Sequence, residues 1–187
     1  MGLIEKLVAF LVKRSQKEHS VVIRTLATIF GAAIFIIGIP LFILWAGGLF
    51  NTGLMLPVLP ARIIAAACFI AGIPCMLSAI LWQLIYGKGT PVPVVPTKHF
   101  LQKGPYRYVR NPMMLGFFLY ILGWAFLGDH PAAFAAVGLI IGLLTMEIKF
   151  LEEPELERRF GNAYLDYKKE TSFLLPKCGC KRKKEAA

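Results

Sequence analysis

The 187-residue sequence lacks the motifs by which soluble enzymes commonly bind nucleotides or cleave esters. It contains no GxGxxG fingerprint, no P-loop and no GxSxG motif. Its three histidines are scattered, and we expect His19 and His130 on opposite sides of a membrane. These absences exclude a Rossmann-type dinucleotide site and a serine-hydrolase site, and they disfavour a three-histidine metal site.

Cysteine is also scarce, and the four present do not form a disulfide framework. Cys68 and Cys75 lie seven positions apart in an apolar run, which places both on one face of a helix, and we interpret them as small packing residues. Cys178 and Cys180 form a CxC pair beside basic residues. A zinc site needs about four ligands, and no other cysteine or histidine pair lies near this one in the sequence. The sequence therefore predicts no metal site.

Acidic residues are few relative to basic ones, with 11 Asp and Glu against 21 Lys and Arg and a net charge of +10. The chain is 57% hydrophobic and has a mean hydropathy of +0.62, which is typical of integral membrane proteins. In such a protein a basic excess indicates orientation and contact with anionic lipid, so we do not expect a nucleic-acid partner. The polar stretches are too short to fold alone, which predicts a single membrane domain over residues 1–187.

Long uncharged runs predict an all-α integral membrane protein with about four transmembrane helices, since a span needs about 20 apolar residues. The predicted spans are residues 25–46, 63–86, 113–128 and 132–150. Residues 47–60 carry Gly, Asn and Pro, and we expect a loop or a re-entrant piece there. We expect an amphipathic interfacial helix in the leader, residues 1–20, and an amphipathic cytoplasmic helix before a basic tail, residues 177–187.

Charge predicts the orientation of these spans. Lys and Arg concentrate in the leader, in residues 87–112 and in the C-terminal part, whereas residues 47–60 hold none. By the positive-inside tendency, both termini and residues 87–112 are expected in the cytoplasm. Two polar stretches, residues 98–114 and 147–167, then lie on the same side. We interpret residues 87–176 as a core in which these stretches form a cofactor pocket, after two N-terminal spans in residues 21–86.

Two predicted spans share a local pattern, FIIGIPLF at residues 35–42 and FIAGIPCM at residues 69–76. Pro40 and Pro74 are expected to kink their helices and to free a carbonyl that neighbouring helices must accommodate. We interpret the repeat as a shared packing requirement, with an old duplication as the alternative.

The first polar stretch, KHFLQKGPYRYVRNPMM, contains a turn and a helix start. Its Gly-Pro pair indicates the turn, and Asn111 and Pro112 suit the N-cap and the first position of the third span. A helix N-terminus favours a carboxylate or another anion, and Arg107 and Arg110 would strengthen such a site. The alternative is a membrane-surface loop whose arginines contact lipid phosphates.

The second polar stretch, EIKFLEEPELERRFGNAYLDY, follows the last span. Charged residues at the end of an apolar helix that faces protein are candidates for function, and Glu152 and Glu153 lie nearest that end. Two later acids, Glu155 and Glu157, are expected to pair with the arginines that follow them on a solvated helix. A Phe-Gly pair is expected to end this helix, before an amphipathic one packed by tyrosines.

Both stretches resemble motifs of the isoprenylcysteine carboxyl methyltransferase family, a group of membrane methyltransferases related to phospholipid methyltransferases. GPYRYVRNPMM, a helical hairpin, and FLEEPELERRFGNAYLDYKKE followed by LLP occur in the family's order over residues 88–176. The resemblance implies S-adenosyl-L-methionine (SAM) as methyl donor at the cytoplasmic face and a lipophilic acceptor that enters from the bilayer. By position it implies cofactor contacts at Lys98, His99, Phe100, Leu101, Tyr106, Asn111, Pro112, Met113, Met114 and Glu152.

The sequence departs from the family pattern at two places. The family usually has Arg-His-Pro-x-Tyr where this chain has RNPMM, so Met114 lacks the ring and hydroxyl of the tyrosine. Family enzymes that act on prenylcysteine have an arginine before the paired acids, and here Lys149 is the available substitute for binding a substrate carboxylate.

We expect Arg110 and Glu153 to be catalytic, with Glu153 as the base for an amine acceptor. A carboxylate or thiolate acceptor needs no base.

Two other functions remain as alternatives. A membrane reductase of the sterol-reductase type resembles the same C-terminal architecture but uses NADPH, and Lys103 and Arg107 leave a 2′-phosphate site open. A non-catalytic membrane scaffold that keeps the fold is the other alternative, and Met114 is its main support. The sequence does not identify the methyl acceptor.

Overall fold

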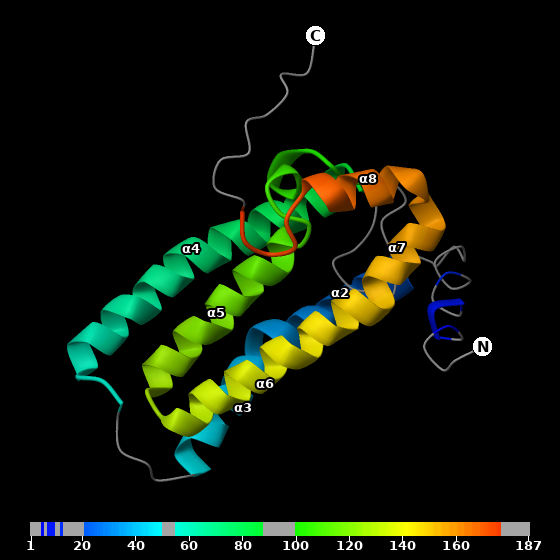
Figure 1. The fold of residues 1–187 in the computed structure, drawn as a ribbon. Coiled ribbons are helices and arrows are strands. Elements are labelled where there is room, and N and C mark those ends of the chain that lie inside the picture. The colour runs from blue at the N-terminus through cyan, green and yellow to red at the C-terminus, as the bar shows by residue number, and fades with distance from the viewer. Residues whose placement is uncertain are drawn as a thin grey trace.

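The computed structural model describes residues 5, 7–9, 12, 21–49, 55–87 and 100–176, which form a bundle of long helices with shorter helices at one end (Figure 1). Most of the predicted interfacial leader and all of the basic tail, residues 177–187, lie outside these described residues. The connector before the first polar stretch does so as well, together with Lys98 and His99.

The first long helix has three parts: α2 (Val21–Ala33), the π-helical turn η1 (Ile34–Gly38) and α3 (Ile39–Leu49). Pro40 has no N–H to donate to the carbonyl of Ile36, four residues earlier. The Tyr120 hydroxyl donates to that carbonyl instead, at 2.8 Å. The expectation that a neighbouring helix accommodates the carbonyl freed at Pro40 is therefore confirmed.

The second long helix, α4 (Val58–Ile85), continues through Pro74. The predicted loop at residues 47–60 was too long, because α3 reaches Leu49 and α4 already begins at Val58. Pro60 lies in the first turn of α4, where a missing N–H breaks no intrahelical hydrogen bond. A proline that looked like a loop signal thus belongs to a helix start.

A tight turn joins α5 (Pro112–Gly128) to α6 (Pro131–Glu147), as predicted. Asp129 in this turn has a positive φ of 50°, and its carboxylate accepts a hydrogen bond from the Leu56 N–H at 3.0 Å. The chain then continues through the π-helical turn η3 (Ile148–Glu152) into α7 (Glu153–Phe160) and α8 (Asn162–Glu170). Gly161, with φ of 55°, lets the backbone turn between α7 and α8.

Within the described residues, three helices are long and apolar enough to cross a membrane, namely Thr28–Leu49, Val58–Ile85 and Pro131–Phe160. The fourth apolar helix, Pro112–Gly128, is shorter and packs along α4. Their outer faces carry many exposed large apolar side chains, as expected for contact with lipid hydrocarbon. The protein is an all-α integral membrane protein; the count of four spans and their orientation stay predictions.

Small residues bring α4 and α5 into close contact. A Cβ on Gly72 would lie 2.7 Å from the Gly116 carbonyl oxygen, and a Cβ on Gly116 would lie 2.4 Å from the Met76 nitrogen. Only glycine fits such a backbone approach between membrane helices. Next to this contact lies an apolar core that includes Ile43, Phe117, Phe118, Ile121, Ala125, Ala133 and Val137.

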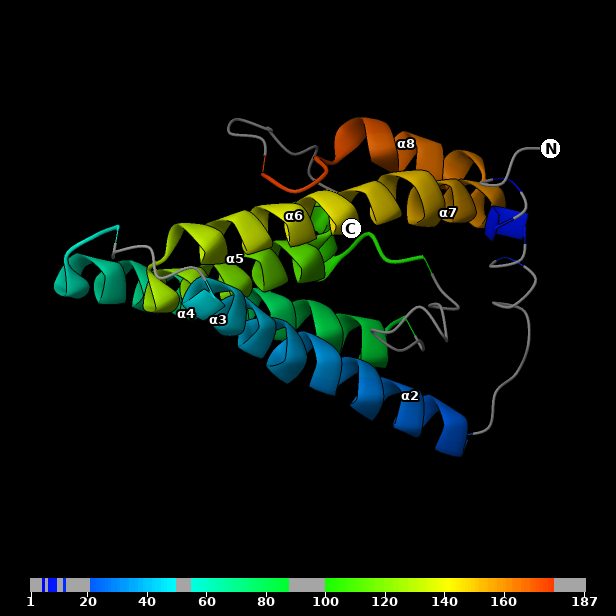
Figure 2. The ribbon, with the colours of Figure 1, turned by 90° about the horizontal axis from the view of Figure 1, so that it is seen from below.

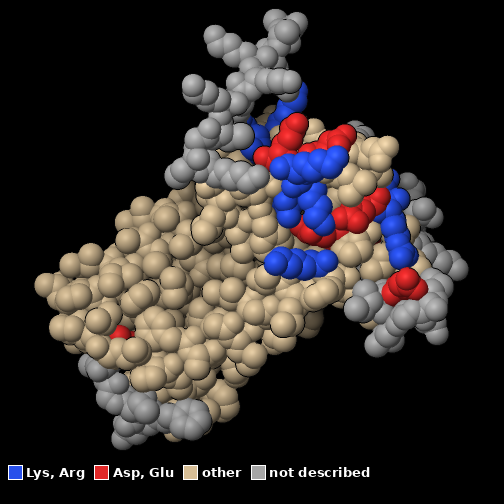
Figure 3. Space-filling view, in the orientation of Figure 1, with Lys and Arg blue, Asp and Glu red and all other residues tan. Residues whose placement is uncertain are grey.

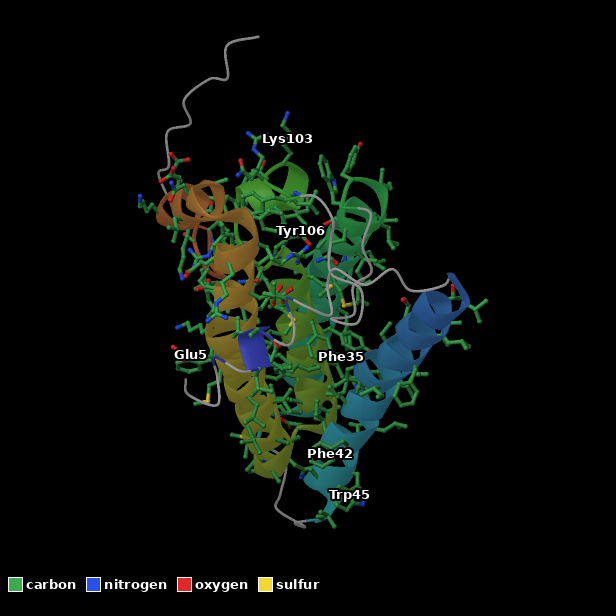
Figure 4. All side chains as sticks on the ribbon, turned by 90° about the vertical axis from the view of Figure 1, so that its right-hand side faces the viewer. Glu5, Phe35, Phe42, Trp45, Lys103 and Tyr106 are labelled. Atoms are coloured by element: carbon green, nitrogen blue, oxygen red, sulfur yellow. The ribbon has the colours of Figure 1, made fainter. Side chains whose placement is uncertain are left out.

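The bundle is closed at the α5–α6 turn and open at the other end. At the closed end α3 packs on α5 and α6, whereas towards the open end α2 diverges from α6 and α7 (Figures 2 and 4). On the face shown in Figure 3, the charged side chains gather over α7, α8 and their neighbours, while most of the remaining surface is uncharged. The two polar stretches of the sequence meet at this charged, open end.

Candidate functional site

A cavity of about 390 Å³ lies at the open end of the bundle. This volume falls within the range of small-molecule sites. The apolar part of its wall comes mainly from α2, η1, α4 and the start of α5, and includes Gly31, Phe35, Ile36, Met76, Ile80, Met113, Met114 and Phe117. The polar part includes Gln83, Tyr106, Arg110, Asn111, Glu147, Glu152, Glu155, Arg159, Tyr164 and Tyr167. The cavity therefore offers an apolar region and a polar region to one ligand or to two adjacent ligands.

The structure brings most of the sequence-predicted site residues to this cavity. Those that line it are Phe100, Leu101, Tyr106, Arg110, Asn111, Pro112, Met113, Met114 and Glu152. Two predicted residues do not line it: Glu153 and Lys149. Lys98 and His99 lie outside the described residues. The roles assigned to these residues from the sequence stay predictions.

A glycine turn positions Tyr106. The 3₁₀ helix η2 (Gly104–Arg107) begins at Gly104, whose φ is 62° and where a Cβ would lie 2.2 Å from the Trp82 ring. The turn therefore lies directly on α4, with Tyr106 buried behind it at the open end (Figure 4). The carbonyl of Tyr106 accepts a hydrogen bond from the Tyr167 hydroxyl at 2.6 Å. This bond ties the turn to α8.

Burial, the negative charge of Glu152 and the proximity of Tyr167 raise the pKa of Tyr106 well above its ordinary value, so the phenol is neutral. Gln83 lies near the hydroxyl and partly offsets the rise, although the two groups do not reach hydrogen-bonding geometry. Burial likewise raises the pKa of Tyr164 and of Tyr167. The tyrosines of the site are therefore hydrogen-bonding groups and not anions.

Asn111 does not cap α5 with its side chain, which corrects the sequence-based prediction. Its Nδ2 and its backbone N–H both donate to the carbonyl of Phe173, each at 3.3 Å. The side chain thus holds the segment after α8. Pro112 does occupy the first helical position. Met113 and Met114 follow it in the first turn, where N–H groups have no intrahelical acceptor, and both residues line the cavity. These N–H groups suit an anionic oxygen.

Arg110 and Glu153 form a buried ion pair. Nη2 of Arg110 lies 2.8 Å from Oε1 of Glu153, and Nη1 donates to the carbonyls of Lys168 and Thr171 at 2.9 and 2.7 Å. Nζ of Lys168 lies 2.7 Å from the other oxygen of Glu153. Both carboxylate oxygens of Glu153 are therefore ion-paired, which favours a role in positioning the C-terminal segment over the predicted role as a base.

Three other carboxylates, Glu147, Glu152 and Glu155, face the cavity. The π-helical turn η3 lengthens one turn of this helix, so the five-residue step from Glu147 to Glu152 keeps both on the cavity wall. Within the described part of the chain, neither of these two has an ion-pair partner. Clustered negative charge of this kind is stabilised by a bound cation or by hydroxyl donors.

The prediction for the later acids was partly right. Glu155 does pair with Arg159, at 3.3 Å, but it is buried on the cavity wall instead of solvated. Among the described residues, Glu157 pairs with Lys168, at 2.8 Å, and with no arginine of its own helix. Residues of the first polar stretch pack on both short helices, since Phe100 stacks on Phe160 of α7 and the Tyr106 carbonyl accepts a hydrogen bond from Tyr167 of α8.

Lys149 does not reach the cavity. Its Nζ lies over the Phe173 ring, 5.2 Å from the centroid, on an exposed part of the helix. A substrate carboxylate in the cavity would therefore not meet this ammonium.

Among the described residues, no group of three or more His, Cys, Asp or Glu side chains could hold a metal ion.

The sequence reasoning missed the wall contributed by the N-terminal half, above all Gln83 of α4. No motif marks this residue. The available signal was a lone amide near the end of an apolar span, on the side predicted to hold the polar stretches.

Comparison with known proteins identifies the family. The model of the phospholipid methyltransferase family matches residues 60–163, which include the cavity residues from Gln83 to Arg159. Comparisons with curated proteins and with solved structures found no match. Because the family match covers more than half of the chain and contains the first polar stretch and most of the second, the chain belongs to the phospholipid methyltransferase family of membrane methyltransferases.

Proposed function

We propose that the protein is a SAM-dependent membrane methyltransferase that transfers a methyl group to a lipophilic acceptor drawn from the bilayer. The observation that carries the proposal is one cavity that combines the N-terminus of α5, carboxylates without an ion-pair partner among the described residues, and an apolar wall. SAM needs the first two features, and a lipophilic acceptor needs the third.

The residues present fit SAM on the chemistry of their groups. The N–H groups of Met113 and Met114 suit the methionine carboxylate, and Glu152 suits ribose hydroxyls or the amino group. The hydroxyl of Tyr106 and Oε1 of Gln83 are buried without a hydrogen-bond partner in the described residues, which supports a polar ligand at this wall. When bound, SAM supplies an electrophilic methyl group on a sulfonium.

The chain's own contribution to such a reaction is alignment and exclusion of water. Apolar side chains such as Phe35, Met76 and Phe117 would hold the acceptor's hydrocarbon part next to the polar region. If the acceptor is an amine, its proton must pass to a group that faces the cavity. Glu147 and Glu152 face it, whereas Glu153 does not.

The same carboxylates disfavour an anionic acceptor. A carboxylate substrate would lie near Glu147 and Glu152, and Lys149 is not available to balance its charge. Arg110 and Arg159 line the cavity but are already paired with glutamates. The proposal therefore favours a neutral or cationic methyl acceptor over an isoprenylcysteine-like carboxylate.

We also propose that the cavity's polar end faces the cytoplasm. The positive-inside tendency predicts this side, and the charged side chains of the face in Figure 3 gather there. Cysteine-accessibility labelling of residue Arg107→Cys in sealed inverted vesicles and in intact cells tests the side. Labelling only in intact cells would contradict it.

Binding calorimetry on the detergent-purified full-length protein tests the cofactor. We expect S-adenosylhomocysteine to bind and NADPH not to bind. Binding of NADPH alone would favour the reductase alternative, and binding of neither would favour a scaffold. A methylation assay with labelled SAM and lipid extract would then identify the acceptor class.

A further inference from the structure

Two buried polar groups on the cavity wall come from different parts of the chain. The Tyr106 side chain belongs to the first polar stretch and is 8% exposed, and the Gln83 side chain belongs to α4. Neither the Tyr106 hydroxyl nor Gln83 Oε1 has a hydrogen-bond partner in the described part of the chain. Leaving such groups unsatisfied is costly. The two groups lie near each other but outside hydrogen-bonding geometry, so a ligand edge with complementary groups would satisfy both.

The stripe of α4 that faces the cavity is apolar up to this point. Met76, Ile80 and Gln83 follow one another at helical spacing, and all three line the cavity. Gln83 is the polar end of the stripe, near the hydroxyl of Tyr106. Trp82, the neighbour of Gln83, holds the turn at Gly104 against α4 and so keeps the two groups together.

We propose that Gln83 and Tyr106 bind the edge of the cofactor's adenine. In this arrangement Gln83 Oε1 accepts a hydrogen bond from the 6-amino group, and the Tyr106 hydroxyl donates to a ring nitrogen. The inference rests on the proposed SAM-dependent function and assigns a residue that selects the base.

The chemistry of the two groups favours a nucleobase over the charged parts of the cofactor. Both side chains are neutral, Tyr106 is buried and Gln83 is half-buried, so neither can balance the charge of the cofactor's carboxylate. An adenine edge presents an N–H donor beside a ring-nitrogen acceptor, which a glutamine amide and a phenol can match. Glu152 is close enough to Tyr106 to raise its pKa, so ribose hydroxyls bound at Glu152 would leave the attached base beside Tyr106.

The test compares S-adenosylhomocysteine with its analogue that carries hydrogen in place of the 6-amino group. Affinities are measured by calorimetry on the full-length protein in detergent. We expect the wild type to bind S-adenosylhomocysteine about tenfold more tightly than the analogue, because the analogue leaves Gln83 Oε1 unpaired. The analogue has no hydrogen-bond donor at this position, so a rotated glutamine amide cannot compensate.

Two variants separate the roles. Gln83→Leu should weaken S-adenosylhomocysteine about tenfold and bind both ligands equally, while Tyr106→Phe should weaken both ligands and keep the preference. Gln102→Leu, the same change at an exposed residue outside the cavity, should change neither affinity. Thermal unfolding of each variant verifies that it is folded.

The outcomes distinguish this inference from the proposed function. Equal wild-type affinities for the two ligands, or a preference that persists in Gln83→Leu, would overturn the adenine assignment while leaving SAM use intact. Absence of binding by both ligands to the wild type would overturn the proposed function and this inference with it. The wild-type comparison needs no variant, so it remains decisive if a substitution prevents folding.

Discussion

Glu152 and Glu153 are adjacent in the sequence, but their surroundings differ completely. Glu153 is buried between Arg110 and Lys168, with both oxygens ion-paired. Glu152 faces the cavity and has no ion-pair partner among the described residues. Successive residues of a helix point about 100° apart, so two neighbouring acids can serve two faces. Glu153 therefore joins parts of the protein to each other, whereas Glu152 is available to bind a ligand.

The ion-paired face organises the site from behind. Arg110 links α7, through Glu153, to the carbonyls of Lys168 and Thr171, and its own N–H donates to the Ser172 carbonyl at 2.8 Å. These bonds fix the residues just before the N-terminus of α5. We therefore expect substitutions on this face to change stability first, and substitutions on the cavity face to change ligand affinity first.

The largest effect is expected for Arg110→Ala. The substitution leaves the buried Glu153 carboxylate and two carbonyls short of partners, and breaking a buried pair in this way costs about 3–5 kcal/mol. Chemical denaturation in detergent measures the loss, and ligand binding should fall with it. Arg107→Ala is the matched control, since Arg107 is exposed and its guanidinium lies over Tyr108. Unchanged stability of Arg110→Ala would show that the ion pair does not hold the segment.

Glu152→Gln should lower ligand affinity without lowering stability. We expect S-adenosylhomocysteine affinity to fall about tenfold or more, because a charged hydrogen-bond acceptor is lost. Stability should stay the same or rise, since the substitution removes repulsion from nearby Glu147 and Glu155. Calorimetry and thermal unfolding measure the two quantities on the same sample. An unchanged affinity would mean that the cofactor does not contact this carboxylate.

Tyr167→Phe removes an uncharged hydrogen bond that links α8 to the 3₁₀ turn η2. The lost hydrogen bond to the Tyr106 carbonyl is buried and 2.6 Å long, and we expect a destabilisation of about 1 kcal/mol. Denaturation measures it, with Tyr86→Phe at an exposed ring as the control. A loss as large as that of Arg110→Ala would contradict the view that charge pairing dominates this face.

The smallest effect is expected for Glu157→Gln. Its pair with Lys168 is about one-third exposed on both sides, with side-chain exposures of 34% and 35%, and such pairs contribute about 0–1 kcal/mol. Denaturation at low and at high salt should give a small difference that salt removes. A large effect that persists in salt would place Glu157 with Glu153 in the ion-paired network.

The helical segments were largely predictable, because long apolar runs admit little else in a membrane. The errors fell at the helix ends. Residues near Val58 and Pro60 resembled a loop, although proline is compatible with a first helical turn. The shared GIP pattern also had two outcomes: a π-helical turn with an open Gly38, and a continuous helix in which Gly72 is tightly packed against α5. The shared pattern alone therefore does not determine the helix geometry.

The candidate site likewise contains residues that the sequence predicted and a residue that it did not. Tyr106, Asn111, Pro112 and Glu152 belong to motifs that identify the family from sequence, and the structure places all four on one cavity wall. Gln83 belongs to no motif and joins them through packing of the 3₁₀ turn on α4. Charge and apolar runs were thus enough to predict a membrane protein and its polar stretches. Only the tertiary structure decided which of the two adjacent acids faces the cavity. Glu153 is buried between Arg110 and Lys168, which come from other segments of the chain, and no local pattern predicts that contact.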